Sequence, residues 1–133
     1  MSDSPGQNIG RLGEDAAASY LEAQGFCVIA RNVHVSHKEI DLIAENDCQM
    51  IFVEVKSRRQ TPHIRSPFGR PVDAVNFKKR KNVADAAQRY LYEHPTTKLP
   101  RIDVIEVFIS PNDPPSVLRI NWFKNAFGAG GQT

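Results

Sequence analysis

The segment Glu39–Lys56 reads EIDLIAENDCQMIFVEVK, in which two apolar runs flank the polar pair Asn46-Asp47. Both runs are short and rich in Ile, Val and Phe, a composition that is typical of β-strands. Asn and Asp tolerate positive φ, so the pair between the runs favours a two-residue turn. The segment therefore predicts an antiparallel hairpin with strands at about residues 39–45 and 49–57.

The register of this hairpin decides which side chains meet. A turn at residues 46–47 pairs Glu45 with Cys48 and makes Asp41 a diagonal neighbour of Glu54, roughly 7–8 Å away at the backbone. Side chains alternate between the two faces of a strand, so residues two apart share a face. The polar residues predicted to share one face are Glu39, Asp41, Glu54 and Lys56.

Carboxylates within otherwise apolar strands repel one another unless a cation compensates their charge. Mg²⁺ takes oxygen ligands, commonly one or two carboxylates together with water and a phosphate. Asp41, Glu54 and the carbonyl of Val55 are the predicted metal ligands, and Mn²⁺ is the alternative ion. Lys56 follows on the same face, where an ammonium can hold the attacking water or counter charge on a phosphate. Glu14 lies on the apolar stripe of the first predicted helix and is expected to join them.

The Glu-x-Lys pattern alone is weak, because a simple ion pair produces it equally well. A basic middle segment adds weight. Residues 55–81 contain nine Lys or Arg side chains and one acid, a net charge of +8, while the remaining residues carry −6. Such a segment indicates a polyanion site, although a solvated basic surface is the alternative. The basic residues of this segment assigned to nucleic-acid binding are Arg58, Arg59, Arg65, Arg70, Lys78, Lys79, Arg80 and Lys81.

The other periodic segments complete a mixed sheet with helices packed on it. Helices are predicted at about residues 7–24 and 73–93, the second with Asp73 as its N-cap. Further strands are predicted at 26–35, 101–110 and 117–122, and 61–71 reads as an exposed loop. We expect residues 1–133 to form one domain, with flexible tails at 1–6 and 128–133.

No apolar run approaches the ~20 residues that span a bilayer, and the N-terminus lacks the features of a signal peptide. We therefore expect a cytoplasmic protein without membrane contact. Cys27 and Cys48 lack metal-ligand spacing and are expected to be buried free thiols. His34 and His37 complete no zinc motif and are expected at the surface.

A family resemblance adds to these inferences. The runs GRLGEDAA at 10–17, EIDLIA at 39–44, FVEVK at 52–56 and RIDV at 101–104 look like the YraN-like family. That family is assigned by similarity to the PD-(D/E)xK nucleases, with a likeness to archaeal Holliday junction resolvases. The resemblance implies a restriction endonuclease-like α/β fold and the catalytic set Glu14, Asp41, Glu54 and Lys56. Lys38 departs from the glycine usual before Glu-Ile-Asp; it is expected to pair with an acid or to contact a phosphate.

The leading hypothesis is an Mg²⁺- or Mn²⁺-dependent endodeoxyribonuclease that acts on branched or damaged DNA in repair or recombination. A homodimer is compatible with this role, because junction cutting would need two sites, and no small-molecule substrate is expected. The alternatives are a non-catalytic nucleic-acid-binding or assembly module that keeps the fold, and an enzyme that processes RNA.

Overall fold

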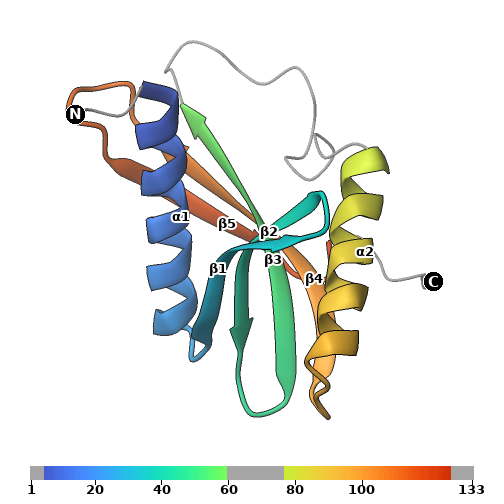
Figure 1. Ribbon diagram of the computed structural model, residues 1–133. Coiled ribbons are helices and arrows are strands. Elements are labelled where there is room, and N and C mark those ends of the chain that lie inside the picture. The colour runs from blue at the N-terminus through green and yellow to red at the C-terminus, as the bar shows by residue number, and fades with distance from the viewer. Residues whose placement is uncertain (1–4, 60–76, 127–133) are drawn as a thin grey trace.

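The computed structural model describes the backbone of residues 5–59 and 77–126, and side chains from residue 9 to 59 and from 81 to 126. The elements in chain order are α1 (Pro5–Ala23), β1 (Cys27–Val35), β2 (Lys38–Glu45), β3 (Gln49–Arg59), α2 (Phe77–Glu93), β4 (Leu99–Ile109) and β5 (Val117–Phe123) (Figure 1). Every predicted helix and strand is confirmed, with ends that differ by a few residues. The Asp73 N-cap, the whole of the predicted loop at 61–71 and the chain ends lie outside the described residues.

The strands form one sheet in the order β1-β2-β3-β4-β5. Adjacent strands are antiparallel except β3 and β4, which are parallel. Parallel neighbours need a crossover, and α2 lies within the connection between these two strands. The mixed α/β class is therefore confirmed.

The two helices cover opposite faces of the sheet, which explains why both faces of the central strands are apolar. On one face, Leu42 and Val53 pack in a core with Ala17 and Leu21 of α1. On the other face, Phe52 belongs to a second core. Its other buried members are Ile40, Ile43 and Met50 of the sheet and Ala86 and Ala87 of α2.

The predicted hairpin register is wrong by two residues. Glu45 pairs with Met50, not with Cys48. The Asn46 side chain accepts hydrogen bonds from the amides of Cys48 and Gln49, at 2.9 and 2.8 Å. Asn46 therefore closes the turn instead of occupying its centre, as Asx turns do. A shift of two residues keeps the paired side chains from Leu42 to Glu45 on their predicted faces. Ile40 departs from this alternation, because it packs with Ile43 and Phe52 in the second core.

The prediction of buried thiols is also wrong. Cys27 and Cys48 are free but exposed. Cys27 begins the edge strand β1 and Cys48 lies in the hairpin turn, and neither position is covered by a helix. Within the described residues, no helix is long and apolar enough to cross a membrane.

Candidate active site

The site begins where β2 and β3 separate. The regular pairing of these strands ends at Leu42 and Val53, and beyond that point the β1–β2 hairpin bends toward α2 while β3 continues straight (Figure 1). Past the last pair, the amide of Val55 donates a 2.8 Å hydrogen bond to Oδ2 of Asp41. The Asp41 carboxylate thus lies against the peptide that joins Glu54 to Val55. Asp41 is thus brought to β3 by a side-chain hydrogen bond, where the sequence predicted a diagonal position in a regular ladder.

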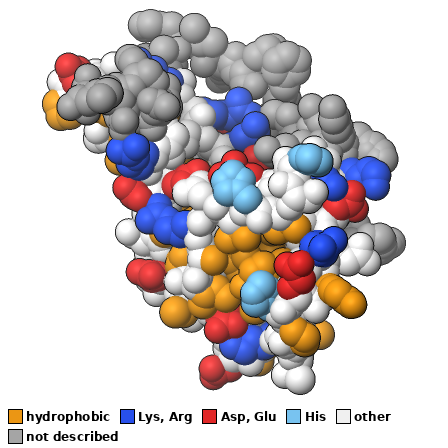
Figure 2. Space-filling model, in the orientation of Figure 1, with side chains coloured by type: hydrophobic (Ala, Val, Ile, Leu, Met, Phe, Trp, Pro, Cys, Tyr) orange, Lys and Arg blue, Asp and Glu red, His pale blue; other side chains and the backbone are white. Residues whose placement is uncertain are grey.

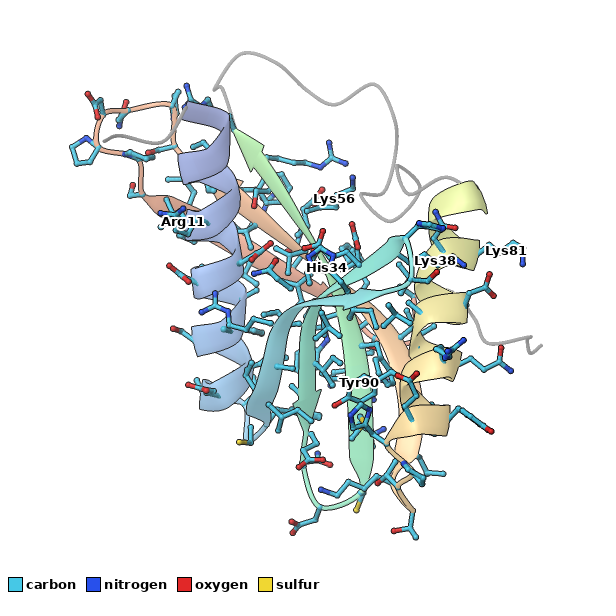
Figure 3. All side chains as sticks on the ribbon, in the orientation of Figure 1. Arg11, His34, Lys38, Lys56, Lys81 and Tyr90 are labelled. Carbon is cyan, nitrogen blue, oxygen red and sulfur yellow. The ribbon has the colours of Figure 1, made fainter. Side chains whose placement is uncertain are left out.

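Glu54 and Lys56 continue along β3 on one face of the strand. Glu54 is 5% exposed, so its carboxylate is almost wholly withdrawn from water. Lys56 is partly exposed, and Figure 3 shows it rising from β3 beside the bent end of the β1–β2 hairpin. A buried acid and a partly exposed cation therefore lie two residues apart on one face, as the sequence predicts.

Glu14 approaches the same region from α1. Burial raises the pKa of the Glu14 carboxyl, and the negative charge of Asp41 raises it further. A hydrogen bond with Asn32 and the positive charge of Arg31 lower the pKa in turn. Asn32 adopts a left-handed conformation in β1, with φ of 52°. Glu14 is therefore close enough to Asp41 to feel its charge, so α1 carries its acid to the diverging end of β2 and β3.

Gly13 explains how α1 comes so close to β3. A Cβ atom at Gly13 would lie 1.8 Å from Oγ and 3.0 Å from Cβ of Ser57. The first separation is too short for a real contact and the second is very tight, so a side chain at this helix position would have to displace Ser57. The absent side chain lets the next residue, Glu14, reach the sheet.

We expect Gly13→Ala to destabilise the fold by about 1–3 kcal/mol, the usual cost of overpacking a tight contact. The gain in helix propensity, about 1 kcal/mol, offsets only part of this cost. Urea denaturation measures the change. Gly10→Ala is the matched control, because a Cβ there meets nothing within 4 Å. That control should stabilise the protein by about 0.5–1 kcal/mol. Equal behaviour of the two variants would contradict the close approach.

The donor set fits a hard divalent cation. Among the described side chains no three His, Cys, Asp or Glu residues are grouped closely enough to hold a metal by themselves. Mg²⁺ does not require such a cage, because it keeps several waters and usually takes one or two carboxylates plus a substrate phosphate. Asp41, Glu54 and the backbone carbonyl of Val55 are the residues that would hold such an ion.

The other predicted binding residues are distributed over two regions. Lys38 and Lys81 both pair with Asp85 of α2, at 3.7 and 3.2 Å. The expected pairing of Lys38 with an acid is thereby confirmed. Arg58 forms an ion pair with Glu106 of β4. Arg59 is exposed at the end of β3. Arg65 and Arg70 lie outside the described residues. The side chains of Lys78, Lys79 and Arg80 lie outside the described side chains.

Sequence reasoning missed two residues beside this site. Glu106 is fully buried, and burial raises its pKa although the Arg58 guanidinium beside it acts in the opposite direction. Asn32 contacts Glu14. An acid in the apolar run of β4 was a visible signal for Glu106, whereas nothing in the sequence pattern singled out Asn32.

Acidic and basic side chains form two neighbouring groups on this face. Figure 2 shows acidic side chains gathered near the middle of the visible face, with Lys and Arg side chains beside them toward the free end of β3. Acids that would hold a cation, flanked by positive charge, suit a substrate that brings its own negative charge.

The fold and the site define a small mixed α/β protein in which one helix and two diverging strands bring acids and a lysine to one end of the sheet. The chain belongs to UPF0102, an uncharacterised protein family whose model matches residues 13–107, and this confirms the YraN-like resemblance. The UPF0102 protein of Dictyoglomus turgidum is 38% identical over 122 residues, which cover 91% of this chain and 98% of that protein. That of Symbiobacterium thermophilum is 40% identical over 124 residues, covering 92% and 98%. That of Syntrophotalea carbinolica is 43% identical over 101 residues, covering 75% and 78%.

The acids at this site should cost stability when no metal is bound. The raised pKa of Glu14 means that its ionised form destabilises the folded state. This cost is absent below the pKa of the unfolded chain, about 4.3, and is complete above the raised folded value. In EDTA at neutral pH, Glu14→Gln should therefore stabilise the protein by about 0.5–1 kcal/mol, a modest amount because solvent screens the partly exposed group.

Thermal melts at pH 4 and pH 7.5 measure this difference, which should be confined to the higher pH. Mn²⁺ at millimolar concentration should then stabilise the wild type more than Glu14→Gln. A variant that is no more stable at pH 7.5 in EDTA would contradict the raised pKa of Glu14, to which burial contributes most and the charge of Asp41 adds.

Proposed function

We propose that this protein is a metal-dependent nuclease that hydrolyses phosphodiester bonds of nucleic acid, and that its substrate is DNA. The observation that carries the proposal is the hydrogen bond from the Val55 amide to Asp41. It holds one acid against the β3 backbone next to Glu54, with Lys56 on the same face. A chance Glu-x-Lys ion pair would not require a second strand to present its acid at that point.

Each residue has a role that follows from its position. Asp41, Glu54 and the Val55 carbonyl would hold Mg²⁺ or Mn²⁺, which when bound lowers the pKa of water and neutralises charge on the phosphate. Lys56 holds the attacking water or the phosphate oxygen by donating hydrogen bonds from its ammonium. Glu14 accepts hydrogen bonds from water on the α1 side of the site.

Nucleic acid is the substrate class that suits the surrounding charge. Four of the described basic side chains between residues 55 and 81 lie at the diverging end of β3 or on α2: Lys56, Arg58, Arg59 and Lys81. Neutralising phosphates with such groups releases condensed counterions and favours binding. Action on branched or damaged DNA stays a prediction drawn from the family resemblance. The homodimer stays a prediction from the two sites that junction cutting needs, and the cytoplasmic location a prediction from the sequence.

The test is cleavage of a panel of labelled substrates by the wild type: linear duplex, four-way junction, single-stranded DNA and structured RNA. We expect cutting of at least one substrate with Mg²⁺ or Mn²⁺ and none with EDTA. Glu54→Gln, purified in the same way, should be inactive, because it removes a proposed metal ligand. The activity of a contaminating nuclease would persist in that preparation, so the variant also tests for contamination. Glu45→Gln is the matched control, since Glu45 lies at the turn end of the same ladder and pairs with Lys98.

Binding without cutting of any substrate would replace the enzyme by a non-catalytic nucleic-acid-binding module. Cutting confined to structured RNA would change the substrate class and leave the site assignment in place. Equal activity of Glu54→Gln and the wild type would remove the proposed site altogether.

A further inference from the structure

Three side chains form a row across the sheet beyond the proposed active site. Arg58 of β3 is the lateral partner of Phe108 of β4, and Phe108 is the partner of Arg119 of β5. Lateral partners project from the same face of a sheet. The sequence separates these residues by up to 61 positions, so no local pattern indicates the row.

The row lies next to Lys56 on the same face. Lys56 is the lateral partner of Glu106, and both residues are two positions before Arg58 and Phe108 on their strands. Two residues of a strand span roughly 7 Å. A polymer bound at Lys56 therefore reaches the row within about one repeat of its backbone.

The guanidinium of Arg58 is held by a buried carboxylate. Its Nε donates to Oε2 of Glu106, whose side chain is fully buried, whereas the Arg58 side chain stays 37% exposed. A guanidinium has five N–H donors, so one bond to Glu106 leaves donors for a ligand. Burying a carboxylate beneath an arginine costs free energy, which favours a function for the pair over a gain in stability.

Arg119 is held by an aromatic ring instead of an acid. Its guanidinium carbon lies 4.2 Å from the centre of the Phe108 ring. Arg119 itself is exposed, while Phe108 is partly buried. An arginine stacked on an aromatic ring loses little freedom when it binds, because its planar group is already held in place. Both cations of the row are therefore pre-positioned, one by a buried acid and the other by a ring.

We propose that the Arg58–Phe108–Arg119 row is a nucleic-acid subsite. It holds the sugar-phosphate backbone of one nucleic-acid strand beside the proposed active site at Lys56. This inference rests on the proposed function, because it extends the same substrate path over β4 and β5. Arg58 and Arg119 are two interstrand spacings apart, roughly 10 Å at the backbone, and each contacts a phosphate. Arginine forks match the geometry of phosphate oxygens, which favours this ligand over a general polyanion.

The test is binding of a fluorescent oligonucleotide to the full chain in EDTA, measured by anisotropy across a salt series. Arg119→Ala should weaken binding about 5- to 20-fold and reduce the slope of log affinity against log salt by about 1. Arg119 is exposed, so this variant should fold. Arg58→Gln combined with Glu106→Gln, which leaves no buried carboxylate alone, should give a similar loss. Arg89→Ala is the control, an exposed arginine of α2 paired with Glu93, and should bind as the wild type does.

Unchanged affinity and salt slope in Arg119→Ala would overturn the subsite, as would a wild type that binds no oligonucleotide. A loss of binding to poly-L-glutamate without a loss for the oligonucleotide would also overturn it, in favour of an acidic protein partner. Failure of the nuclease proposal is separate. If Glu54→Gln cuts as fast as the wild type while Arg119→Ala loses affinity, the subsite stands and the catalytic assignment falls.

Discussion

Asp41→Asn is expected to abolish metal-dependent cleavage while leaving the fold intact. The asparagine oxygen can still accept the hydrogen bond from the Val55 amide, so the diverging ends of β2 and β3 keep their arrangement. What the variant loses is the negative charge that a divalent cation requires. We expect the single-turnover rate to fall by at least about 10²–10³-fold, the scale on which losing one preorganised electrostatic group slows an enzyme.

Calorimetric titration with Mn²⁺ gives a second readout that is independent of the substrate. The wild type should take up the ion with release of heat or protons, and Asp41→Asn should show no uptake. Glu45→Gln again serves as the control and should behave as the wild type in both assays. A variant that cleaves normally, or a wild type that takes up no Mn²⁺ even with oligonucleotide present, would contradict the metal site.

Asp103→Ala is expected to be the most destabilising single substitution in the described part of the chain. Asp103 is fully buried in β4 and accepts two 2.9 Å hydrogen bonds from Arg101. It also accepts bonds from Nε1 of Trp122 at 2.9 Å and from the Asn125 amide at 2.7 Å. One carboxylate thereby joins β4 to β5 and to the segment that follows β5.

Removing the Asp103 carboxylate leaves the Arg101 cation, whose side chain is 17% exposed, without its partner. Breaking such a pair from one side typically costs about 3–5 kcal/mol. That is a large share of the 5–15 kcal/mol by which a domain is stable. Urea denaturation followed by Trp122 fluorescence would measure the loss, because this indole contacts Asp103 directly.

Two further variants serve as controls for the stability loss of Asp103→Ala. Asp103→Asn keeps an acceptor oxygen for Trp122 and should lose less stability than the alanine. Asp85→Ala removes an acid from a partly exposed pair with Lys81 and should change stability by no more than about 1 kcal/mol. Comparable losses from Asp85→Ala and Asp103→Ala would show that burial of the Asp103 network is not what stabilises it.

Local patterns in the chain were sufficient for the elements and for the core of the candidate site. Apolar runs of strand length, a helical stripe on α1 and a turn pair at Asn46 predicted all five strands and both helices, because these features depend on neighbours close in sequence. The position of Glu54 and Lys56 on one face of β3 was predictable for the same reason. Alternation along a strand survives a register error of two residues, so the wrong turn centre did not affect it. The place of Asp41 is instead shown by its hydrogen bond with the Val55 amide.

Long-range packing determined the features that no local pattern contains. The contact of Gly13 with Ser57, the charge coupling of Glu14 to Asp41 and the row from Arg58 to Arg119 all join segments that are distant in sequence. Their geometry depends on where α1 rests on the sheet and on how β3 pairs with β4 and β4 with β5. Side-chain hydrogen bonds of Asn46 set the register, and sequence periodicity carries no information about such bonds.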